Sequence, residues 1–167
     1  MKVNGKFSSI FLTTFSIQNT NIKHGNGKII WPDGSIYEGQ FERNQANGKG
    51  RFLSTYGLLY EGDFYKDKIQ GFGVLTVQSG ARYEGQWQNN LQNGKGKEIY
   101  EAEGTVFVGN FMNGVREGYG YLEQKDGSSY NGQYRKNQKN GHGTYRWADG
   151  REYSGMWVNG RMHGHGI

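Results

Sequence analysis

The chain has 167 residues, of which 29 are Gly, one is Pro and none is Cys. The lack of Cys excludes disulfides and thiolate metal sites. The 4 Trp, 12 Tyr and 9 Phe argue against disorder, since disordered chains are poor in aromatic residues. The net charge of +5 is modest, and no apolar run reaches the roughly 18 residues of a membrane-spanning helix.

The first residues precede the periodic part of the chain. Residues 7–17 are apolar but diluted by Ser and Thr, and they lack Arg, which favours a first strand or cap over a signal or transit segment. We expect residues 1–13 to form an N-terminal cap or extension. Residues 14–36 keep later glycines of the repeat but lack its aromatic opening, so we interpret them as a degenerate capping repeat.

From residue 37 onward a pattern of aromatic-x-Gly-x-aromatic recurs at steps of 23, 23, 24, 23 and 23 residues. A Gly-x-Gly pair begins nine residues after the Gly of each unit, and one more Gly follows most pairs. Such a period is typical of repeat architectures. Alternation of side chains predicts two strands in each copy, in the order strand, six-residue loop, strand and tight turn. The six aromatic-Gly-aromatic units begin at Tyr37, Tyr60, Tyr83, Phe107, Tyr130 and Tyr153.

The unit Tyr-Glu-Gly-x-Trp/Phe, followed by Gly-x-Gly at this period, resembles the MORN (membrane occupation and recognition nexus) repeat family. The resemblance covers six copies over residues 37–167, the last one truncated, and the degenerate copy at 14–36. It implies an all-β fold, an elongated single-layer antiparallel meander of about seven stacked β-hairpins that make one repeat domain. It also implies scaffolding, membrane-to-cytoskeleton linkage or targeting, and no catalysis by the repeats.

The alternation puts the aromatic residues on one face and mostly polar residues on the other. Glycine leaves room for a ring of the neighbouring strand, an arrangement known as aromatic rescue. We expect a large exposed aromatic face, which marks an interaction site, although rings and glycines that only satisfy each other remain an alternative. The residues expected to line a partner-binding groove are Tyr60, Phe64, Tyr83, Trp87, Phe107, Phe111, Tyr130, Tyr134, Tyr153 and Trp157.

Basic residues of the hairpin loops support a rival hypothesis. If they share one edge, they would attract anionic phospholipid, and the chain would be a peripheral membrane adaptor. The residues proposed for this alternative lipid site are Lys66, Lys68, Arg135, Lys136 and Lys139.

Catalytic and cofactor chemistry find no support in the pattern. His142 and His165 occupy equivalent positions of neighbouring repeats, but no fitting acidic or Cys ligand accompanies them, so we expect no metal and no cofactor. The Gly-x-Gly pairs enter strands, whereas phosphate-binding glycines open a helix. The acidic excess of residues 33–133 disfavours nucleic acid.

We therefore expect a non-enzymatic, intracellular scaffold that binds a helix or extended peptide along the aromatic groove. The resemblance points to larger assemblies, cytoskeletal or ciliary (axonemal), with the cytoplasm or cytoskeleton as the location. A regulatory partner of an enzyme is a further alternative. The C-terminal strand edge is predicted to associate with a second copy or with another protein.

Overall fold

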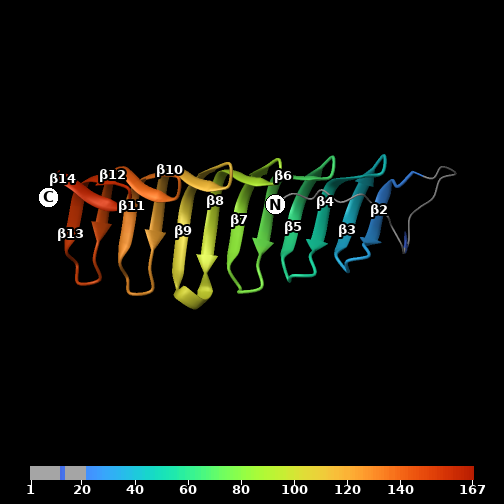
Figure 1. Cartoon of the computed structure of the whole chain (residues 1–167), viewed down its shortest axis with the longest axis horizontal. Helices are drawn as coiled ribbons and strands as arrows, with labels where there is room; N and C mark the ends of the chain where they lie inside the picture. The colour runs from blue at the N-terminus through green and yellow to red at the C-terminus, as the bar shows by residue number, and fades with distance from the viewer. Residues whose placement is uncertain (1–11, 14–21) are drawn as a thin grey trace. The chain divides into compact units, whose positions relative to one another are not determined.

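The computed structural model describes residues 12–13 and 22–167. Consecutive strands of the chain are neighbours in the sheet, and the pairings are antiparallel (Figure 1). The described residues contain no α-helix, and the predicted all-β antiparallel meander of hairpins is confirmed. The elements are β1 (Leu12–Thr13), β2 (Gly25–Ile30), β3 (Ile36–Glu42), β4 (Gln45–Leu53), β5 (Leu59–Tyr65), β6 (Lys68–Thr76), β7 (Arg82–Gln88), β8 (Leu91–Tyr100), η1 (Glu101–Glu103), β9 (Thr105–Met112), β10 (Val115–Glu123), β11 (Ser129–Arg135), β12 (Gln138–Arg146), β13 (Glu152–Val158) and β14 (Arg161–Gly166).

Contacts divide the chain into two compact units. The first unit comprises the residues up to Ser79 together with Trp87–Leu91, and the second comprises Gly80–Gln86 together with Gln92–Ile167. Most of the predicted cap at 1–13, and the beginning of the predicted degenerate repeat at 14–36, lie outside the described residues.

The first kind of turn is the one expected at Asp-Gly pairs. Between β2 and β3, Gly34 N–H donates to Trp31 O at 2.9 Å and Trp31 N–H donates to Ser35 O at 3.0 Å. Gly34 has φ +86°, the left-handed conformation that ends a three-residue hairpin loop. Asp33 Oδ1 accepts hydrogen bonds from the amide and the hydroxyl of Ser35. The third repeat interval is one residue longer, and its turn contains the 3-10 helix η1, closed by Gly104.

The second kind of turn differs from the prediction. The expected six-residue loop after each aromatic unit is wrong, because β3 and β4 continue to a two-residue tip at Arg43 and Asn44. Both tip residues have positive φ (49° and 72°), as in the type I′ turns that suit twisted hairpins. The strand pairing shifts register between Gly39 and Phe41, so a bulge bends the hairpin where a loop was expected.

Each tip is also bonded to the hairpin of the preceding repeat. Asn137 N–H donates to Arg116 O at 3.0 Å, and Asn137 Oδ1 accepts from Arg116 N–H at 2.7 Å. Asn90 makes the same two bonds to Ile69 within the first unit. At Gly160 the backbone bond to Lys139 O remains, at 2.9 Å, but there is no side chain to make the second bond. Asn, Asp or Gly at the second tip position is the sequence signal of this contact.

Exchanging Asn and Gly between tips tests the contribution of the side-chain bond. We expect Asn137→Gly to lower the free energy of unfolding by about 1 kcal/mol, because Gly accepts φ +68° but leaves Arg116 N–H without its acceptor. We expect Gly160→Asn to raise it, since Asn tolerates φ +79° and nothing lies within 4 Å of the added Cβ. Urea unfolding followed by circular dichroism measures both changes. Shifts of the same sign in the two variants would contradict this role.

Candidate interaction surface

The aromatic residues that open the repeats lie over pairs of glycines. Gly132 and Gly143 face each other across β11 and β12, and the Tyr130 hydroxyl donates to Gln133 O at 3.0 Å above them. A Cβ added to Gly132 would lie 2.5 Å from Gly143 Cα and 2.6 Å from the Tyr130 hydroxyl oxygen. The predicted packing of rings on side-chain-free strands is therefore confirmed.

The rings also pack against one another, edge to face. In the first unit the ring centroids of Tyr37 and Phe64 are 5.0 Å apart, and those of Tyr60 and Trp87 are 5.4 Å apart. In the second unit Phe107 and Tyr134 are 5.1 Å apart, with an interplanar angle of 78°. Each of these pairs joins rings of successive repeats in a geometry that aromatic quadrupoles favour. The aromatic residues thus form the core of each unit.

This packing changes the interpretation of the predicted groove residues. Nine of the ten are buried, Tyr153 is half-buried, and Tyr60, Phe107 and Tyr130 have no exposed surface. The expectation of a large exposed aromatic face is wrong at these positions, because the rings cover one another and the glycines. Their role in partner binding stays a prediction. The half-buried aromatic side chains beside them in the second unit are Tyr145, Trp147 and Tyr153.

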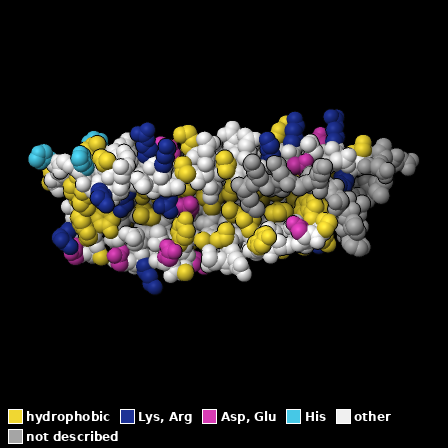
Figure 2. Space-filling model, viewed as in Figure 1, with side chains coloured by type: hydrophobic (Ala, Val, Ile, Leu, Met, Phe, Trp, Pro, Cys, Tyr) yellow, Lys and Arg dark blue, Asp and Glu magenta, His cyan; other side chains and the backbone are white. Residues whose placement is uncertain are grey.

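The side chain of Lys139 lies among three aromatic rings of the second unit. Its Nζ is 4.9 Å from the ring centroid of Tyr130, 4.4 Å from that of Tyr145 and 5.0 Å from that of Trp157. Burial lowers the pKa of Lys139 by disfavouring the charged amine. Figure 2 shows hydrophobic side chains gathered over β12 and β13, with Lys and Arg side chains beside them. Lys139, Tyr130, Tyr145 and Trp157 are called the Lys139 cluster below.

The other residues of the predicted lipid site differ from Lys139. Lys66, Lys68, Arg135 and Lys136 are exposed. In the first unit Lys68 Nζ donates to Asn89 Oδ1 at 3.3 Å. In the second unit Arg135 and Lys136 adjoin one another at a hairpin tip. The lipid site itself stays a prediction.

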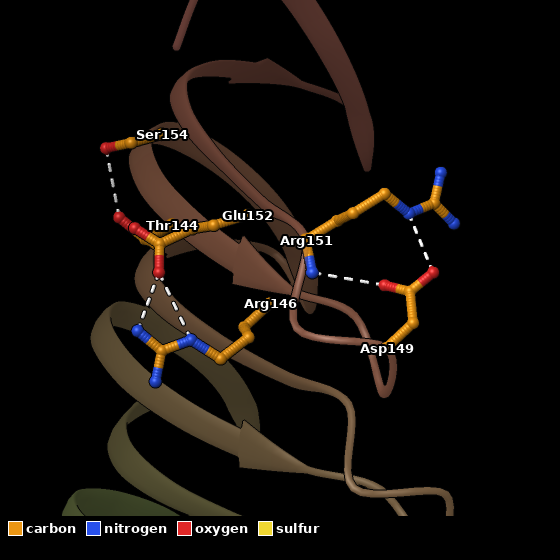
Figure 3. Close-up of polar contacts among 6 residues, drawn as sticks. All are labelled: Thr144, Arg146, Asp149, Arg151, Glu152 and Ser154. Carbon is orange, nitrogen blue, oxygen red and sulfur yellow. Dashed lines mark hydrogen bonds and ion pairs between the residues drawn. The ribbon is translucent and has the colours of Figure 1, made fainter.

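Several cations of the second unit are neutralised by acids of the same unit. Arg146 Nη2 lies 2.7 Å from Glu152 Oε2, and Arg151 Nε lies 2.7 Å from Asp149 Oδ2 (Figure 3). Thr144 and Ser154 share a hydroxyl–hydroxyl hydrogen bond of 3.0 Å on neighbouring strands. These exposed pairs contribute little to stability, but they reduce the unpaired positive charge near the C-terminal repeats.

Each unit also has an open hollow above its glycine pairs, on the face opposite to the rings. The hollow of the second unit measures about 600 Å³ and includes Tyr119, His142 and His165 in its lining. The hollow of the first unit measures about 610 Å³ and is lined by residues of both charges, among them Lys49 and Glu61. Within the described residues, no group of three or more His, Cys, Asp or Glu side chains is placed to hold a metal ion.

Tyr134 differs from its equivalents in neighbouring repeats, which are Phe or Trp. Its hydroxyl is buried and has no hydrogen-bond partner among the described residues. We expect Tyr134→Phe to stabilise the second unit by about 1 kcal/mol, because it removes a polar group that was desolvated without compensation. Tyr130→Phe is the matched control and should destabilise by a similar amount, since it loses the bond to Gln133 O. Thermal unfolding of the two variants measures the difference, and equal effects would contradict it.

Comparison with known proteins identifies the repeat. A family model described as "MORN repeat" matches residues 21–36, 37–55, 60–82, 83–104, 107–129, 130–150 and 153–167. No curated protein matches the chain. Among solved structures, the chain is similar to the SAS-4 (dCPAP) TCP domain in complex with a proline-rich motif of Ana2 (dSTIL) of Drosophila melanogaster. The identity is 11%, the alignment covers 94% of this chain and 97% of the other, and the TM-score is 0.38, which supports no statement about shared binding. No helix in the described residues has the length and apolar character needed to cross a membrane.

Proposed function

The chain belongs to the MORN repeat family, and from that premise we propose that it is a non-enzymatic scaffold subunit that binds a protein partner. The partner segment is a helix or an extended peptide that lies along the ring side of the repeats. The assembly is intracellular, and the cytoskeleton, including the cilium, is the place we propose for it. MORN repeats serve interaction with proteins or membranes, and the finer assignment to a protein partner rests on the surface of the second unit.

The observation that carries this proposal is the row of half-buried rings beside the buried ones. Tyr145 faces both Tyr130 and Tyr153 across neighbouring strands, so all three side chains share the ring side of the sheet. The ring centroid of Trp147 is 5.0 Å from that of Tyr145. Partly exposed aromatic side chains next to a rigid core resemble the aromatic anchors of protein interfaces.

The experiment is copurification from the native source with the wild-type chain and with a Tyr145→Ser, Trp147→Ser variant. Replacing core rings such as Tyr83, Trp87 or Phe111 would unfold the repeats and would not separate binding from stability. We expect the surface variant to keep its circular dichroism spectrum and to lose the partner. Equal recovery of the partner by both chains would contradict a binding role for this surface.

The second candidate is a peripheral membrane adaptor, favoured by the exposed Lys66, Lys68, Arg135 and Lys136. Each exposed cation near an anionic surface contributes about 1 kcal/mol of attraction. Flotation with phosphatidylserine vesicles at physiological salt separates the two functions. The scaffold should stay in the soluble fraction, whereas an adaptor should float and should lose flotation when Lys66 and Lys136 are changed to Glu.

A further inference from the structure

The Lys139 cluster holds a cation against three aromatic rings without an acidic partner. Lys139 is half-buried, and none of the carboxylates in the described residues forms an ion pair with it. A desolvated ammonium group is costly unless it is paired. The rings offset part of this cost through cation–π attraction, but no side chain or carbonyl of the described residues accepts a hydrogen bond from the amine.

The preceding repeat shows how this chain completes the same arrangement. Arg116 is one repeat earlier than Lys139, and the two residues face the equivalent rings Phe111 and Tyr134 across their hairpins. The guanidinium of Arg116 lies 4.2 Å from the ring centroid of Phe107. Its Nη2 and Nε lie 2.6 and 2.7 Å from Glu98 Oε2. A cation on an aromatic ring is therefore paired with a carboxylate in one repeat of the second unit.

The register identifies the residue that stands in place of this carboxylate in the next repeat. Glu98 faces Phe107 across β8 and β9, and Leu122 faces Tyr130 across β10 and β11. Phe107 and Tyr130 open successive repeats, so Leu122 occupies the position equivalent to Glu98. The chain thus supplies the acid for Arg116 itself and supplies an apolar side chain beside Lys139.

We propose that the Lys139 cluster binds a side-chain carboxylate, from Glu or Asp, of the partner segment that the scaffold holds. This inference rests on the proposed function, since it names the chemistry of the partner at one position. Residues two positions before and after the acid would be apolar, because Tyr145 adjoins Lys139 and the half-buried Trp147 adjoins Tyr145. Charge complementarity and the internal example of Glu98 support a carboxylate as the occupant.

A protein carboxylate fits this position better than a lipid phosphate. Headgroup binding draws on several exposed cations, whereas Lys139 is a single, half-buried one. The nearby Arg146 and Arg151 are already paired with Glu152 and Asp149. One cation surrounded by rings matches one negative charge carried on an apolar segment.

The test uses the full chain with ¹³C-labelled lysine and two blocked peptides, Leu-Ser-Glu-Ser-Leu and Leu-Ser-Gln-Ser-Leu. We expect the Glu peptide to shift the Lys139 Cε resonance and to bind about tenfold more tightly than the Gln peptide, which corresponds to about 1.4 kcal/mol. Lys139→Met should abolish this preference. Equal binding of the two peptides, or a shift of Lys139 caused only by phosphatidylserine vesicles, would overturn the proposal.

A second variant supplies the carboxylate from within. Leu122→Glu should shift the Lys139 resonance without any peptide and should lower the affinity of the Glu peptide about tenfold, while Leu122→Gln should leave its preference over the Gln peptide intact. If Leu122→Glu folds and still prefers the Glu peptide, the proposal is wrong. If the wild-type chain binds the Glu and Gln peptides equally but still copurifies its native partner, only this inference is wrong. If no partner copurifies from the native source, the proposed function is wrong, whereas a measured preference for the Glu peptide remains valid.

Discussion

Gly85→Ala is expected to lower the free energy of unfolding of the second unit by about 3 kcal/mol. A Cβ at this position would lie 2.6 Å from Gly96 Cα, 2.6 Å from Lys95 O and 2.6 Å from the Tyr83 hydroxyl oxygen. Two of these atoms belong to the backbone of the neighbouring strand, so a change of side-chain rotamer cannot relieve the overlap. The strands must therefore separate, and the ring of Tyr83 must also move from its position over the glycines.

Gly127→Asn is the matched control for this prediction. Gly127 has φ +85°, which Asn adopts with little strain, and nothing lies within 4 Å of its added Cβ. We expect a change within about 0.5 kcal/mol for this turn variant. The loss at Gly85 corresponds to a fall in Tm of roughly 12–24 °C for a unit of about 80 residues. If both variants melt at the wild-type temperature, the glycine pair is not a packing requirement.

Local sequence chemistry predicted a large part of this fold. The Asp-Gly turns follow from the conformational freedom of Gly, and Gly34 has the positive φ that this reasoning requires. The packing of Tyr130 on Gly132 and Gly143 follows from side-chain alternation together with the need to cover bare backbone. In both cases the residues that decide the structure lie within one repeat.

The features that the sequence did not predict depend on contacts between repeats. The burial of Tyr60 comes from Phe64 and from Trp87 of the following repeat, a contact whose geometry alternation alone does not give. The bonds from Asn137 to Arg116 depend on a strand that bends at a bulge. Lys139 lies close to a hairpin tip in the sequence, like the exposed cations of the predicted lipid site, and this position does not reveal that its amine packs against rings.

High pH is expected to unfold the second unit steeply, because its buried tyrosines keep their protons only in the folded state. Burial raises the pKa of Tyr130 to about 12. It also raises the pKa values of Tyr83 and Tyr134 above the ordinary value of 10.0, and for Tyr83 the nearby Glu98 adds to the increase. The unfolded chain releases these protons near pH 10, so stability is unaffected below that pH and falls above it. Each tyrosine contributes a loss of about 1.4 kcal/mol per pH unit.

With three such residues, the free energy of unfolding falls by roughly 4 kcal/mol per pH unit. A typical stability of about 5–15 kcal/mol is therefore lost within a few pH units above pH 10. We expect the tyrosinate absorbance of Tyr130, measured as the difference between the wild type and Tyr130→Phe, to appear together with the loss of strand circular dichroism. Tyr130→Phe removes one of the protons and should make the dependence shallower by about 1.4 kcal/mol per unit. If the tyrosinate of Tyr130 forms near pH 10 while the strand signal persists, this ring is open to solvent, and the packing of rings on glycines is not what holds the hairpins together.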